Sequence, residues 1–95
     1  MQLDIVQNPA RRDLLRLAES GYVGALRDPA TGDLYAWPAT VALHADVADR
    51  LALPFRTRAE LAWHSFLFSR RQIERAAVRD LAGLIAIVLS IASLG

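Results

Sequence analysis

Two aspartates enclose a short polar stretch of the chain, and this pair has the residue type that acid–base or cation chemistry requires. Asp28 and Asp33 are the ends of the sequence Asp-Pro-Ala-Thr-Gly-Asp. Carboxylates that converge can transfer protons or bind a cation. The stretch lacks the spacing and the third ligand of an EF-hand loop, however, and Asp, Pro and Gly in this order are typical of a turn. We therefore expect Asp28 and Asp33 to shape a turn rather than to form a site.

The two histidines are the other candidates for chemistry. His44 precedes Asp46 and Asp49, but side chains two apart on a helix point in different directions, so His44 and Asp46 cannot reach one ion. His64 lies among β-forming residues, and neither histidine has a serine in a recognisable nucleophile motif. The sequence has no cysteine and no glycine-rich phosphate loop. We expect no catalytic residue, no metal site and no cofactor, and hence a protein that is not an enzyme.

Length and composition indicate one small domain over residues 1–95. The hydrophobic fraction of 54% is high enough for a packed core. The absence of cysteine fits a reducing compartment, and the N-terminus lacks the order of a signal peptide, so we expect a cytoplasmic location. The net charge of +1 argues against an acidic mimic of DNA and against a strongly basic nucleic-acid binder.

A stripe of arginines is the main charged feature. Arg71, Arg75 and Arg79 repeat every four residues and so share one face of a helix, beside Arg70. This face is either a solvated, salt-bridging surface, a contact surface for a partner protein, or a surface for nucleic-acid phosphates.

Two aromatic residues follow the predicted turn. Residues 22–27 and 34–37 have the pattern of a β-hairpin, in which Arg27 pairs with Leu34 and Gly24 faces Trp37. Tyr35 and Trp37 then share one face of the sheet. That face is either the core or an exposed surface for a partner, so both residues are candidate partner-binding residues.

Other elements follow from capping and breaking signals. Asn8-Pro9 predicts a helix over about 9–19 that ends at Ser20-Gly21, and Thr40 predicts a helix over about 41–53. Two capping boxes follow at Thr57 and Ser69.

The spacing of the two boxes predicts a short helix near 58–62, a strand near 63–68 and a long helix from Arg70. One continuous helix over 58–94 is the alternative.

Residues 81–94 carry no charge, so they belong in a core, between subunits or in lipid, although about 21 Å of helix is short for a membrane. The fold class expected is α+β: an N-terminal helix, a β-hairpin, a helix, a third strand, and a long C-terminal helix packed on a small antiparallel sheet.

A set of residues between positions 8 and 53 follows a known pattern: Asn8, Pro9, Arg11, Leu26, Gly32, Asp33, Tyr35, Trp37 and His44. With these residues the sequence resembles a small module of tailed-phage and prophage proteins. The chain departs from that pattern at Pro38, where an Asp is usual, and at Leu43, where a Thr is usual. The resemblance implies a phage or prophage origin and assigns no role to any residue.

Together these features predict a non-enzymatic viral protein that acts by protein–protein interaction, as a virion or assembly component or as an inhibitor of a host defence system. We expect a homo-oligomer, a dimer in the simplest case, or docking through residues 81–94. One alternative is a small nucleic-acid-binding protein that uses Arg70, Arg71, Arg75 and Arg79. The other is a tail-anchored membrane protein that uses residues 81–94.

Overall fold

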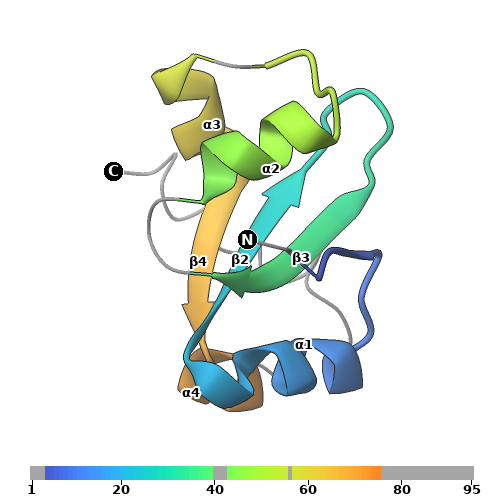
Figure 1. The fold of residues 1–95 in the computed structure, drawn as a ribbon. Helices are drawn as coiled ribbons and strands as arrows, with labels where there is room; N and C mark the ends of the chain where they lie inside the picture. Colours follow the sequence, from blue (N-terminus) through green and yellow to red (C-terminus); the bar gives the residue numbers. More distant parts are fainter. Residues whose placement is uncertain (1–3, 40–42, 56, 76–95) are drawn as a thin grey trace.

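The computed structural model describes residues 4–39, 43–55 and 57–75, which form both helices and strands (Figure 1). In chain order they are β1 (Val6–Gln7), α1 (Arg11–Leu17), the 3₁₀ turn η1 (Ala18–Ser20), β2 (Tyr22–Arg27), β3 (Leu34–Ala39), α2 (His44–Arg50), α3 (Arg58–His64), β4 (Ser65–Ser69) and α4 (Arg70–Arg75).

The strands form one antiparallel sheet in the order β1-β3-β2-β4, which confirms the α+β class. The hairpin has the predicted register, with Arg27 opposite Leu34 and Gly24 opposite Trp37. The expected third strand is β4, which pairs with β2 on the side away from β3. Because β4 interrupts the helical residues of this region, the alternative of one continuous helix over 58–94 is wrong.

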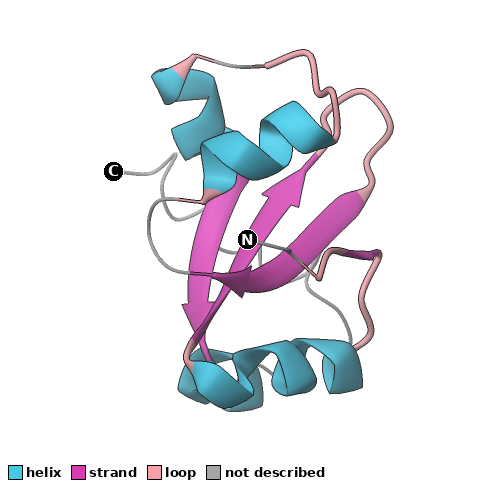
Figure 2. Cartoon of the chain, viewed as in Figure 1, coloured by secondary structure: helices cyan, strands magenta, loops and turns pink. Residues whose placement is uncertain are grey.

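Helices pack on both faces of the sheet, because side chains alternate along each strand. Figure 2 shows two helices toward the upper end of the strands and two toward the lower end. Side chains of β2 and β3 on one face pack against α1 and α4, and those on the other face pack against α2 and the segments on either side of α3. The buried residues of the first face are Leu14, Leu17, Ala18, Val23, Ala25, Leu34, Ala36, Phe68 and Ile73. Those of the second are Leu26, Trp37, Ala39, Val47, Ala48, Leu53 and Phe55.

The centre of the second face is Trp37, which has 0% of its surface exposed. Its indole lies over Gly24 on the neighbouring strand. A Cβ atom placed on Gly24 would come 2.6 Å from Trp37 Cε2 and 2.7 Å from Ala39 Cβ. Gly24 therefore supplies the space that the indole occupies.

Two capping boxes position the elements of the second half. Thr57 Oγ1 accepts a hydrogen bond from the Glu60 amide at 3.2 Å and begins α3. Ser69 Oγ accepts from the Gln72 amide at 3.2 Å, while Gln72 Oε1 accepts from the Ser69 amide at 2.8 Å, and α4 begins there. Both predicted starts are confirmed. The strand begins two residues later than expected because α3 continues to His64, where the Ser65 hydroxyl donates to the Leu61 carbonyl.

The predicted start of the first helix is wrong. Asn8 does not cap it: this residue has a left-handed φ of 49° and its side chain turns to the hairpin. The Asp13 carboxylate instead accepts from the Ala10 amide at 3.1 Å, so α1 begins at Arg11.

The remaining helix predictions are met in part. The helix expected over 41–53 is seen as α2, His44–Arg50, and its predicted cap Thr40 lies outside the described residues. The predicted long C-terminal helix begins as α4, and Arg70–Arg75 is the part of it that the structure describes. Arg79 and residues 81–94 lie outside the described residues.

Candidate functional site

The two aspartates of the hairpin shape its turn. Asp28 Oδ1 accepts from the Ala30 amide at 2.9 Å, and the Asp28 carbonyl accepts from the Gly32 amide at 2.7 Å. The Asp28 amide closes the loop on the Asp33 carbonyl at 2.8 Å, and Gly32 takes a φ of 79° that favours glycine. The prediction of a turn is confirmed, and within residues 4–39, 43–55 and 57–75 no group of three acidic or histidine side chains could hold a metal ion.

Asp33 also connects the turn to the N-terminal strand. Asn8 Nδ2 donates to Asp33 Oδ1 at 3.2 Å, and Asn8 Oδ1 accepts from the Leu34 amide at 3.1 Å. Sequence reasoning missed this role, since an Asn before a Pro is also the usual signal of a helix start. The Asp33 side chain is therefore a structural acceptor.

The two aromatic candidates on β3 have different surroundings. Trp37 has no exposed surface, so it is a core residue and has no area with which to contact a partner. Tyr35 is half-buried, and the pKa of its hydroxyl is raised by burial and then by the Asp33 and Asp28 carboxylates. The phenol therefore stays protonated at neutral pH.

His44 stands at the start of α2 against the edge of Trp37. The ring centroids are 5.1 Å apart and the planes meet at 81°, an edge-to-face contact. Neither His44 Nδ1 nor Trp37 Nε1 has a hydrogen-bond partner in the part of the chain that the structure describes. Burial lowers the pKa of His44, so this imidazole is neutral in the folded protein at neutral pH.

An open pocket lies where α3 meets the hairpin. Its volume is about 230 Å³, and it is lined by Arg27, Pro29, Trp63 and His64. Trp63 is 50% exposed, while the His64 ring packs on Phe55 with centroids 4.9 Å apart. The pocket combines an accessible indole, a guanidinium and an imidazole.

Sequence reasoning did not identify this pocket. The sequence pattern predicted a strand that includes Trp63, because the residues that follow Trp63 favour a strand. The available signal was the Thr57 capping box, because a helix that begins there and packs Leu61 against the core turns Trp63 outward.

The arginine stripe is exposed in its described part. Arg70, Arg71 and Arg75 all reach solvent, and Arg70 Nε pairs with Glu74 Oε1 at 2.9 Å. Helix α1 lies beside α4 (Figure 1), and Arg11 donates to the Glu74 carbonyl at 3.2 Å. The stripe therefore has arginines of α1 as neighbours, which no local sequence pattern indicates.

Comparison with models of known protein families, with curated proteins and with solved structures finds no match to this chain. Among the described helices, none has both the length and the apolar character needed to cross a membrane.

Proposed function

We propose that the protein is a non-enzymatic interaction module of phage or prophage origin, acting in the host cytoplasm or on the virion. It binds a partner protein through the pocket of Arg27, Pro29, Trp63 and His64. The phage origin rests on the resemblance over residues 8–53. The partner would belong to the virion, to its assembly or to a host defence system.

The observation that supports this function is the exposed Trp63 beside Arg27. Trp63 keeps 50% of its surface accessible while its neighbours form a concave wall around it. Tryptophan and arginine are the residue types that most often contribute large binding energies at protein interfaces. A volume of about 230 Å³ suits one inserted side chain of a partner rather than a whole small-molecule substrate.

The test is a quantitative affinity purification from cells that carry the gene, with three forms of the protein. Trp63→Ala removes the indole, and Tyr22→Ala is the matched control because Tyr22 is an equally exposed aromatic, 52%, at the opposite end of β2. We expect a partner whose recovery falls about tenfold or more with Trp63→Ala, the loss of one interface hot spot, and is unchanged with Tyr22→Ala.

Equal losses with both variants would contradict the proposed contact surface. Turnover of a substrate by the purified protein, abolished by changing one polar residue, would contradict the non-enzymatic function itself. Self-association or docking through residues 81–94 remains a prediction, and light scattering of the purified protein distinguishes monomer from dimer.

A further inference from the structure

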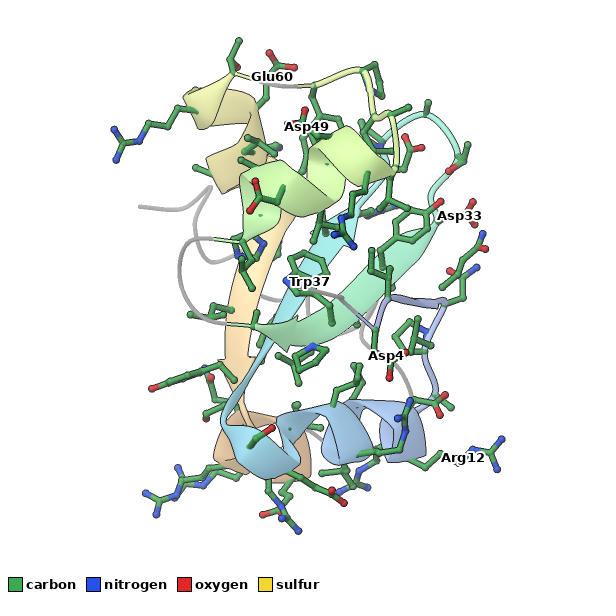
Figure 3. The ribbon with its side chains drawn as sticks, in the orientation of Figure 1. Asp4, Arg12, Asp33, Trp37, Asp49 and Glu60 are labelled. Carbon is green, nitrogen blue, oxygen red and sulfur yellow. The ribbon has the colours of Figure 1, made fainter. Side chains whose placement is uncertain are left out.

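The helix pair α1–α4 concentrates positive charge at one end of the molecule. These two helices contain six arginines and two acidic residues, a net charge of +4, whereas the whole chain carries +1. Figure 3 shows Arg12 pointing away from the molecule at this end, with Asp33, Asp49 and Glu60 at the other. Positive and negative side chains are therefore concentrated at different ends of the molecule, although their numbers in the whole chain are nearly equal.

Asp4, Asp13 and Glu74, three acidic residues near this end, are engaged, while Glu19 of η1 is exposed. Several arginines of the described residues are left without an acidic partner. Asp4 pairs with Arg16 at 3.3 Å and Glu74 pairs with Arg70 at 2.9 Å. The Asp13 carboxylate accepts from the Ala10 amide at the start of α1. The arginines without an acidic partner among the described residues are Arg11, Arg12, Arg71 and Arg75 on these helices.

An exposed aromatic side chain lies at the same end. Tyr22 is 52% exposed and follows the 3₁₀ turn that closes α1. Its cross-strand partner is Ser69, the residue that begins α4 immediately before Arg70. Tyr22 therefore lies at the end of the sheet from which the arginine-bearing helix starts, with its side chain on the face of Gly24 and Leu26, opposite the face that α1 and α4 cover.

We propose that Tyr22 and the α1–α4 arginines form a binding site for single-stranded nucleic acid. Proteins bind single strands by pairing a cationic surface, which contacts the phosphates, with aromatic rings on which bases stack. Arg71 and Arg75 lie one helical turn apart, about 6 Å along the axis, which allows both to contact one strand. Arg11 and Arg12 widen the cationic surface from the neighbouring helix. This site goes beyond the proposed protein contact and uses none of its residues.

The experiment measures fluorescence anisotropy of a labelled oligo(dT) of about 20 nucleotides with the full chain over a range of salt concentrations. The double charge reversal Arg71→Glu/Arg75→Glu should weaken binding about tenfold or more at low salt. It should also reduce the slope of log affinity against log salt by about 1.4, or 0.7 for each lost phosphate contact. Tyr22→Ala should weaken binding about fivefold or more without changing the slope, and Tyr22→Phe should retain most of it.

The controls are Arg58→Glu, an exposed arginine on α3, and Trp63→Ala, both of which should leave oligo(dT) affinity within about twofold, because they lie outside the cationic surface. Three results would overturn the proposal: no oligo(dT) binding at low salt, an equal loss with Arg58→Glu, or tighter binding to duplex DNA or to anionic phospholipid vesicles than to oligo(dT). Circular dichroism of each variant shows whether the fold is retained, and Tyr22→Phe keeps the site testable if Tyr22→Ala unfolds.

Discussion

At the scale of single residues, the Trp37 indole packs directly against the backbone of Gly24. The indole fills the space in which any other residue at position 24 would place its Cβ. The pairing of Gly24 with Trp37 could be predicted from the sequence. The turn residues determine the register of the hairpin, and the register determines which residue lies opposite Gly24. The same logic could not show whether the indole faced core or solvent.

We expect Gly24→Ala to destabilise the protein by about 1–3 kcal/mol, because the new methyl group would overlap Trp37 and Ala39 in a filled core. Urea unfolding measures the change. The combination with Trp37→Phe, which shortens the ring system, should cost less than the sum of the two single changes. A Gly24→Ala protein as stable as the wild type would show that the indole can move aside.

His44 predicts a dependence of stability on pH. Burial lowers its pKa in the folded state below the ordinary value of 6.5, so the folded protein binds the proton less readily than the unfolded chain. Stability should be full above pH 6.5 and fall as the pH drops below it, until the lowered pKa of the folded state is reached.

The measurement is urea unfolding at a series of pH values from 7 downward, with His44→Phe as the matched variant. Phenylalanine keeps an aromatic ring against Trp37 and cannot bind a proton. The variant should lose less stability than the wild type over this range. Identical losses in both proteins would assign the effect to other groups.

At the scale of elements, the capping and turn residues in the sequence correctly predicted the features that depend on interactions between neighbouring residues. Both capping boxes begin helices where expected, and the hairpin turn has the hydrogen bonds that its Asp, Pro and Gly residues indicate. Asn8 shows the limit of such signals. Its side chain hydrogen-bonds to Asp33 of the hairpin, 25 residues away, and does not cap the adjacent helix. The proximity of α1 to α4 likewise depends on the whole fold.

The Ser69 box gives a prediction for α4. Ser69→Ala removes the acceptor of the Gln72 amide at the start of the helix and should cost about 1 kcal/mol. Thr57→Ala, in the matching box of α3, should cost a similar amount. Thermal unfolding of both variants checks this, and a Ser69→Ala protein of unchanged stability would show that strand pairing alone places α4.

At the scale of the whole molecule, the two proposed surfaces are at opposite ends of the sheet. The pocket with Trp63 lies beside the hairpin turn. The cationic helix pair lies where β2 begins (Figure 1). Occupation of one surface therefore leaves the other accessible. The sequence contained the arginines and aromatics of both surfaces, but only the fold shows which of them meet.

The strand order has a consequence for the sequence of folding events. Strand β2 pairs with β3 across the short turn of residues 28–33, but with β4 only after residues 28–64 have closed a long loop. Closing the longer loop costs more chain entropy, so the hairpin is expected to form early and β4 to join late and to detach first. In native-state hydrogen exchange, the amides that link β4 to β2 should exchange faster than those that link β3 to β2. Equal rates would mean that the sheet opens as a single cooperative unit.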